Sequence, residues 1–118
     1  MTTLIPWLAE PQNARAMDFY QSAFDAVSVY QTADPDGDVV ARLSIDGAEF
    51  WLSEELNQPT TNLATRMILT TADPEGLFSQ ALAAGATQLY PIHEEHGWRV
   101  GRLIDPFGHH WEIGAQLG

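Results

Sequence analysis

The sequence contains no cysteine and no lysine, and both absences narrow what the protein can do. Without cysteine there is no disulfide, no thiolate nucleophile and no cysteine ligand for a metal. Five arginines stand against sixteen acidic residues, which gives a formal charge of −11. Such a field repels phosphate backbones and anionic lipid headgroups. We therefore expect neither nucleic acid nor a membrane as a partner.

Long apolar runs and nucleotide or hydrolase motifs are also missing. Glu10, Arg15 and Asp18 interrupt the first twenty residues, which therefore do not resemble a signal peptide or a membrane span. No glycine-rich phosphate loop, GxSxG elbow or HExxH zinc motif occurs. We expect a cytoplasmic protein.

What is present is enough apolar material for one packed domain. The chain has 118 residues, of which 45% are hydrophobic and 18% are charged. This balance favours a globular fold over a disordered chain. At this length the chain is one domain, or two small repeats fused together.

The first half predicts the order βαβββ. Apolar periodicity and turn residues favour a strand over 4–9, a helix over about 13–24, and strands over 27–32, 38–45 and 48–53. Turns are predicted at 34–37 and at Asp46-Gly47, the latter a strong hairpin signal.

The second half predicts the same order after a polar link over 55–65. Asp73-Pro74-Glu75 is typical of a helix start, and Gly85 is typical of a helix end. Strands are predicted over 66–71, 87–90, 98–104 and 110–114, with a loop over 91–97 and a turn over 105–108.

The two halves align with each other. Residues 4–8 lie over 65–69 and residues 50–52 over 111–113, both at an offset of 61. Internal repetition of this kind constrains the fold strongly. We predict a single domain over 1–118, made of two repeats over about 3–54 and 65–115.

Three stretches carry a family resemblance. They are Ala16-Met17-Asp18-Phe19-Tyr20, Ala83-Ala84-Gly85-Ala86, and the run from Gly101 to Ile113 that includes Asp105-Pro106-Phe107-Gly108. With them the chain resembles the glyoxalase, bleomycin-resistance and extradiol-dioxygenase proteins, the vicinal oxygen chelate superfamily. The resemblance implies an α+β fold of two βαβββ modules, with curved mixed sheets enclosing a cavity and helices outside. It also implies a homodimer and, in the enzymes, a divalent metal held by four side chains.

The four positions that the resemblance assigns to metal ligands are occupied here by Ile5, Trp51, Arg66 and Glu112. Only Glu112 can donate to a cation, and the fixed positive charge of arginine repels one. We therefore expect no metal at this site and no cofactor.

Strand alternation predicts which side chains face a cavity. One parity is apolar and should pack under the helices: Leu4, Pro6, Leu8, Phe50, Leu52, Met67, Leu69, Trp111 and Ile113. The other parity should form a pocket wall: Ile5, Trp7, Glu49, Trp51, Ser53, Arg66, Ile68, Thr70, His110, Glu112 and Gly114.

Arg66 and Glu112 fall on neighbouring strands of the second repeat, and we predict that they form an ion pair. A guanidinium nearby offsets the cost of desolvating the carboxylate. Two roles for the pair remain open. Glu112 could act as a general base while Arg66 holds an anionic substrate, or the pair could only neutralise an empty cavity.

The predicted ligand-binding residues are Trp7, Trp51, Arg66, Trp98, Arg102 and His110, with Glu112 as the candidate catalytic residue. His110 shares the parity of Glu112. His93 and His96 are expected to be solvated in the loop over 91–97, beside Glu94 and Glu95.

These features predict a protein that binds a small organic molecule in a metal-free, aromatic-lined cavity, similar to the drug-sequestering resistance proteins of the superfamily. The charge of −11 is compatible with a cationic ligand. One alternative is a lyase, isomerase or transferase that uses Glu112 as a base, or an atypical metal site with His110. Another is a protein whose dimer surface is its working part.

Overall fold

The computed structural model describes residues 2–10, 13–33, 39–54 and 65–118. The chain divides into two compact units, residues 1–59 and 60–118. The turn predicted at 34–37 and most of the link predicted at 55–65 lie outside the described residues.

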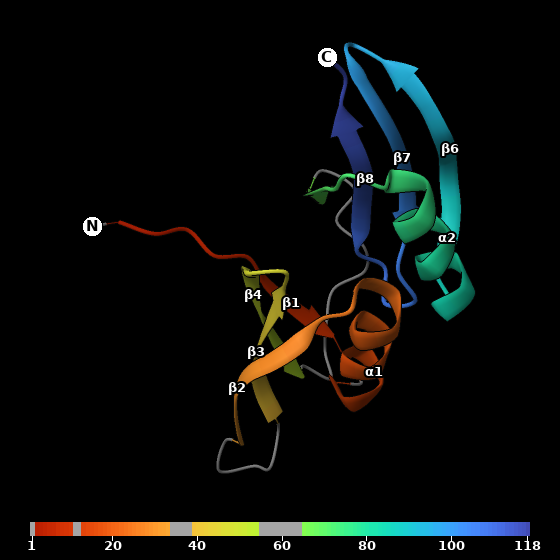
Figure 1. Ribbon diagram of the computed structural model, residues 1–118. Helices are drawn as coiled ribbons and strands as arrows, with labels where there is room; N and C mark the ends of the chain where they lie inside the picture. The colour runs from red at the N-terminus through yellow and green to blue at the C-terminus, as the bar shows by residue number, and fades with distance from the viewer. Residues whose placement is uncertain (1, 11–12, 34–38, 55–64) are drawn as a thin grey trace. The chain divides into compact units, whose positions relative to one another are not determined.

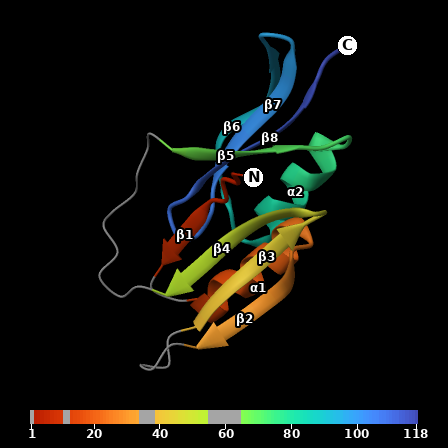
Figure 2. The same cartoon turned by 90° about the vertical axis from the view of Figure 1, so that its left-hand side faces the viewer.

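The first unit is a four-stranded sheet with one helix. Its elements are β1 (Trp7–Glu10), α1 (Asn13–Phe24), β2 (Val27–Ala33), β3 (Val39–Ile45) and β4 (Ala48–Glu54). The strand order is β1-β4-β3-β2, in which β1 is parallel to β4 and the other pairs are antiparallel. Helix α1 packs against β3 and β4, behind the strands that face the viewer in Figure 2.

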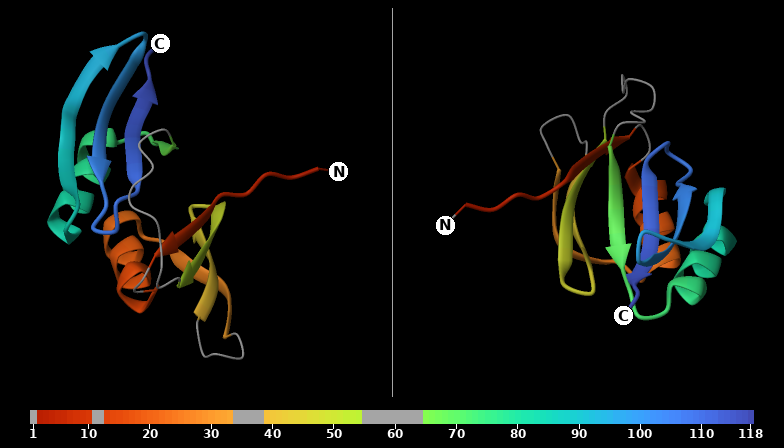
Figure 3. Two further views of the ribbon diagram at one scale, coloured as in Figure 1. Left: turned by 180° about the vertical axis from the view of Figure 1, so that it is seen from behind. Right: turned by 90° about the horizontal axis from the view of Figure 1, so that it is seen from above.

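The second unit repeats this arrangement. Its elements are β5 (Arg66–Thr70), α2 (Pro74–Ala84), β6 (Thr87–Glu95), β7 (Trp98–Ile104) and β8 (His110–Gln116). The order is β5-β8-β7-β6, again with one parallel pair, and α2 covers one face of β6, β7 and β8 (Figures 1 and 3). The predicted α+β fold of two βαβββ modules is confirmed. No helix in the described parts of the chain is long and apolar enough to cross a membrane.

One face of each sheet is buried against its helix. From the predicted apolar set, the buried side chains are Leu8, Phe50, Leu52, Trp111 and Ile113. The prediction is wrong for Leu4, which is 96% exposed. Pro6 is also exposed, and Met67 and Leu69 are only half-buried.

The first strand is shorter than predicted and begins at Trp7 rather than at residue 4. Pro6 has no N–H to donate to a sheet. Its carbonyl still accepts a hydrogen bond from the backbone N–H of Trp51 at 2.8 Å. Leu4 therefore lies before the pairing starts and outside the core.

Helix α2 begins and ends as predicted. The carboxylate of Asp73 accepts a hydrogen bond from the backbone N–H of Gly76 at 3.1 Å, and Pro74 occupies the first turn. Gly85 ends the helix with a φ of 123°, a backbone conformation that favours glycine.

The loop predicted over 91–97 is wrong, because β6 continues through Pro91 to Glu95. β6 is the edge strand of its sheet and its pairing is irregular between Tyr90 and His93, so Pro91 removes no essential hydrogen bond. The hairpin turn is reduced to His96 and Gly97, both with positive φ. His93 is thus a strand residue.

Candidate functional site

The sheet face away from the helix carries the candidate residues in each unit. In the first unit this face presents an aromatic surface built on β1 and β4. The rings of Trp7 and Trp51 stack with centroids 5.5 Å apart and planes 21° apart. Trp7 and Trp51 are Cα partners of the parallel strand pair, so sheet register brings the two indoles together. The Trp7 Nε1–H donates to the hydroxyl of Ser53 at 2.8 Å, which fixes the ring.

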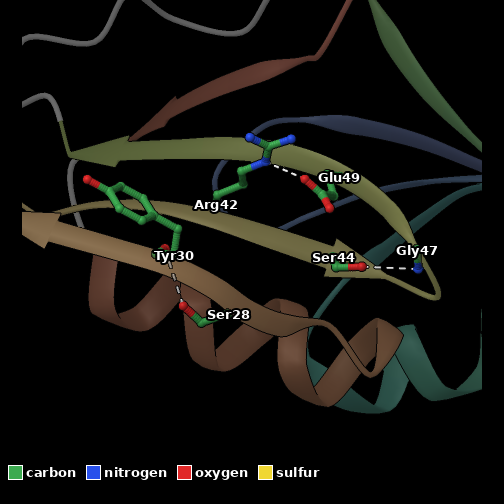
Figure 4. A network of polar contacts seen from close by, with 6 residues as sticks. All are labelled: Ser28, Tyr30, Arg42, Ser44, Gly47 and Glu49. Atoms are coloured by element: carbon green, nitrogen blue, oxygen red, sulfur yellow. Dashed lines mark hydrogen bonds and ion pairs between the residues drawn. The ribbon is translucent and has the colours of Figure 1, made fainter.

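Strands β2 and β3 extend this aromatic surface. The Tyr30 ring meets Trp51 edge to face at 5.9 Å, and the Arg42 guanidinium lies 5.4 Å from the centre of the Trp51 ring. Arg42 also forms an ion pair with Glu49, drawn in Figure 4. Figure 4 further shows the Gly47 backbone N–H donating to Ser44, which holds the hairpin between β3 and β4. These contacts leave an aromatic face with its charges paired.

An open hollow of about 500 Å³ lies on this face. It is lined by Val29, Tyr30, Arg42, Glu49 and Trp51. Of the residues predicted for ligand binding, Trp51 lines this hollow. The Trp7 ring, on the neighbouring strand, stacks on the ring of Trp51. Tyr30 is 52% exposed and Trp7 is 54% exposed, so both rings are accessible to a ligand.

In the second unit the corresponding face is polar. Arg66 on β5 and Glu112 on β8 form the predicted ion pair, and this prediction is confirmed. The Glu112 side chain is 20% exposed and that of Arg66 is 44% exposed. The guanidinium therefore neutralises a carboxylate that is largely withdrawn from water.

A second hollow, of about 320 Å³, lies on this face. Its lining residues are Arg66, Tyr90, His93, Glu95, Val100, Gly101, Arg102 and Glu112. The structure thus brings three predicted residues together here, namely Arg66, Arg102 and Glu112.

His93 and Glu95 occupy the rim of this hollow. His93 Nε2 lies 2.7 Å from a carboxylate oxygen of Glu95, and Nδ1 lies 2.9 Å from the Pro91 carbonyl. The Pro91 carbonyl and the Glu95 carboxylate raise the pKa of His93, because both favour the protonated ring. The expectation that His93 is a solvated loop residue is therefore wrong in part: it is exposed, but it lies on a strand and lines the hollow.

His110 and Trp98 are not among the residues that line this hollow. His110 is 3% exposed, and neither ring nitrogen has a hydrogen-bond partner in the described structure. Burial lowers the pKa of His110, and the nearby charges of Arg102 and Arg66 lower it further. The imidazole is therefore neutral at neutral pH. Trp98 is half-buried at the start of β7, beside Glu95.

Sequence reasoning missed Tyr30, Arg42 and Tyr90. The internal repeat could have found them, because Tyr30 and Arg42 recur sixty positions later as Tyr90 and Arg102. The sheet register matches as well: Tyr30 is opposite Arg42, and Tyr90 is opposite Arg102. Each module therefore places a tyrosine beside an arginine on its open face.

A divalent cation does not fit the four positions that the resemblance assigns to metal ligands. Ile5 and Trp51 offer no lone pair, and Trp51 is packed against Trp7. Glu112 is the one donor of the four, and its carboxylate is paired with Arg66. Among the described residues, no three histidine, aspartate or glutamate side chains are grouped as a metal site.

Comparison with known protein families gives a match to the Glyoxalase-like domain over residues 7–114. An uncharacterized protein of Mycobacterium bovis is 37% identical, in an alignment that covers 97% of this chain and 83% of the relative. An uncharacterized protein of Mycobacterium tuberculosis is also 37% identical, with 97% of this chain and 74% of the relative covered.

Solved structures share the fold. The fosfomycin resistance protein FosX of Listeria monocytogenes superposes with a TM-score of 0.79 at 15% identity, covering 98% of this chain and 93% of its own. TioX of a Micromonospora species gives a TM-score of 0.77 at 22% identity, covering 99% of this chain and all of its own. At these identities the likeness concerns the fold alone.

Proposed function

The chain belongs to the glyoxalase-like domain family of the vicinal oxygen chelate superfamily, and from this premise we propose that it binds a small organic molecule without a metal. The observation that carries the proposal is the aromatic surface of the first unit, where Trp51 and Tyr30 line an open hollow and the Trp7 ring stacks on Trp51. Aromatic rings offer a large apolar contact area, and ligand pockets are typically lined by them.

The test is a fluorescence screen of a metabolite library, read through tryptophan. We expect saturable quenching by at least one compound. Removing the half-buried indole in Trp51→Ala should weaken that compound's binding about tenfold, since stacking on one aromatic ring contributes roughly 1–3 kcal/mol. Trp98→Phe is the matched control, because Trp98 lines neither described hollow. A library without any saturable compound would contradict the proposal.

We propose that no metal is bound because, of the four positions that the resemblance assigns to metal ligands, only Glu112 can donate to a cation. Metal analysis of the purified protein tests this. The expected result is less than stoichiometric nickel, zinc, iron or manganese. A stoichiometric metal that is lost in Glu112→Gln would overturn this part and favour an atypical site at Glu112 and His110.

A second candidate function is that of a lyase, isomerase or transferase with Glu112 as general base. It is favoured by one observation: Glu112 and Arg66 both line the hollow of the second unit, so a carboxylate and a cation face the same space. Mass spectrometry of library compounds incubated with the protein distinguishes binding from turnover. A product that forms with the native chain and is lost in Glu112→Gln would support the enzyme.

We also propose that the protein is a homodimer, on the basis of the family resemblance. Large apolar side chains that a dimer could cover are exposed on both sheets, including Val29 and Ile68. Light scattering after size exclusion should give twice the 13.0 kDa mass of one chain.

A further inference from the structure

Arg102 differs from other arginines of the structure in its lack of a partner. Arg42, Arg66 and Arg99 each form an ion pair with a glutamate. Within the described residues the side chain of Arg102 forms no ion pair and no hydrogen bond, and its Nε is buried without a partner. A buried donor without an acceptor is costly, so this guanidinium is poised to gain from one.

The internal repeat shows why the partner is missing. Arg102 corresponds to Arg42, since each is the cross-strand partner of the corresponding residue, Glu112 or Trp51. In the first unit Arg42 is neutralised by Glu49 (Figure 4). The position equivalent to Glu49, sixty-one residues later, is His110. The second module has therefore exchanged the neutralising carboxylate for an imidazole.

That imidazole cannot replace the carboxylate. His110 is buried, and its depressed pKa keeps it uncharged beside Arg102 and Arg66. Glu112, which is opposite Arg102 across the strand pair, is engaged by Arg66. The other carboxylate of the hollow, Glu95, is bonded to His93. Each carboxylate that lines the hollow thus has a partner. Among the lining cations in the described structure, the guanidinium of Arg102 is the one without a carboxylate partner.

We propose that the hollow of the second module takes a small organic acid and that Arg102 binds its carboxylate. This inference rests on the proposed function and names its ligand class. A planar guanidinium matches a carboxylate with two parallel hydrogen bonds. A hollow of about 320 Å³ suits a molecule with a single ring, whose body would lie against Tyr90 and Val100. The pairing of both acids also disfavours a cationic ligand, despite the overall charge of −11.

The test uses three probes of one size: benzoate, benzamide and benzylammonium. Their binding is followed by NMR titration of the ¹⁵N-labelled full chain, including the Nε–H signals of the arginines. We expect benzoate to bind at least tenfold more tightly than either other probe, as one charge-assisted hydrogen bond contributes about 1.5–3 kcal/mol. The Nε–H signal that disappears in Arg102→Lys should shift during the benzoate titration.

The variant Arg102→Gln should lose the preference for benzoate. Arg99→Gln is the matched control on the same strand, because it removes the same charge from an arginine that pairs with Glu75 and does not line the hollow. Arg102→Lys keeps the positive charge but loses the planar guanidinium that donates two parallel hydrogen bonds. It should therefore retain part of the preference for benzoate over benzamide. Thermal unfolding verifies that each variant is folded, and Arg102→Lys serves if Arg102→Gln is not.

The outcomes separate this inference from the proposed function. Equal binding of benzoate and benzamide, or a preference that survives in Arg102→Gln, overturns the role of Arg102 while the small-molecule function stands. Tighter binding of benzylammonium overturns it in favour of a cationic ligand. If no probe binds and the metabolite library also gives no saturable compound, the proposed function fails and this inference fails with it.

Discussion

The ion pair between Arg66 and Glu112 occupies two of the four positions that the family resemblance assigns to metal ligands. Both side chains remain in partial contact with water, at 44% and 20% exposure. Exposed ion pairs contribute little to stability, whereas a pair that is shielded on one side contributes somewhat more. The pair therefore serves to neutralise Glu112 more than to hold the fold.

A double-mutant cycle with Arg66→Gln and Glu112→Gln measures this contribution. We expect a coupling free energy of about 0.5–1 kcal/mol from urea unfolding. The pair Arg99 and Glu75, which is more exposed, is the control and should give a smaller coupling. A coupling near zero for Arg66 and Glu112 would show that the pair is not formed in solution.

His110 makes stability depend on pH. Its folded pKa lies below the ordinary value of 6.5, first because it is buried and then because Arg102 and Arg66 lie nearby, with Asp105 acting in the opposite sense and His109 adding to the lowering. The unfolded chain therefore binds the proton more readily. The stabilisation is complete above about pH 6.5 and is lost as the pH falls from there toward the folded pKa.

We predict that His110→Gln has a flatter dependence of unfolding free energy on pH than the native chain between pH 7.5 and 5.5. His93→Gln is the control: the raised pKa of His93 gives stability that is present below its unfolded value and lost as the pH rises. That variant should keep or steepen the native slope. Parallel curves for His110→Gln and the native chain would contradict the assignment.

At the scale of elements, α2 depends on a capping contact that is readable in the sequence. The Asp73 carboxylate accepts a hydrogen bond from the backbone N–H of Gly76. Pro74 has no backbone N–H, so it leaves no donor unpaired in the first turn. This contact fixes where α2 begins, and α2 covers the face of β6, β7 and β8 that lies behind the hollow.

Asp73→Ala should lower the unfolding free energy by about 1 kcal/mol, the usual cost of losing a capping carboxylate. Asp73→Ser, which restores an acceptor, should recover most of the loss. Asp18→Ala, an exposed substitution within α1, is the control and should change stability by no more than about 0.5 kcal/mol. An Asp73→Ala variant as stable as the native chain, or a loss that Asp73→Ser does not recover, would contradict the role of the capping hydrogen bond.

At the scale of the whole molecule, the net charge of −11 sets the main electrostatic contribution to stability. Five arginines can neutralise at most five of the sixteen acids, so most carboxylates repel one another. Added salt screens this repulsion, because the screening length falls from about 30 Å at 0.01 M to about 8 Å at 0.15 M. Salt also weakens ion pairs, but those that the arginines form in the described parts of the chain are partly exposed and contribute little to stability.

The thermal unfolding midpoint should therefore rise by a few degrees as NaCl is raised from 0.01 to 0.2 M. KCl at equal ionic strength is the control and should give the same rise, which excludes binding of one particular cation. A midpoint that falls with salt would show that the ion pairs outweigh the general repulsion.

The sequence by itself determined the order of the elements and the repetition of the module. The signals are local: Asp46-Gly47 sets a hairpin, Asp73 and Gly85 bound a helix, and alternation separates Phe50 from Trp51. It also predicted the Arg66–Glu112 pair, because the family resemblance implies that the first and last strands of a module, which carry these residues, bring them together. The course of β6 through Pro91 was not predictable, since proline is tolerated there only because the strand lies at the sheet edge.

Only the tertiary structure decided which charges are satisfied. Strand alternation put Arg66, His110 and Glu112 on one face and predicted that Arg66 pairs with Glu112, but it did not say that Arg102 lies opposite Glu112 without an ion-pair partner among the described residues. It also did not say that His110 is buried. The physical reason is that ion pairing and burial depend on neighbours from strands far apart in the sequence. Those neighbours leave the guanidinium of Arg102 as the feature on which the proposed ligand class depends.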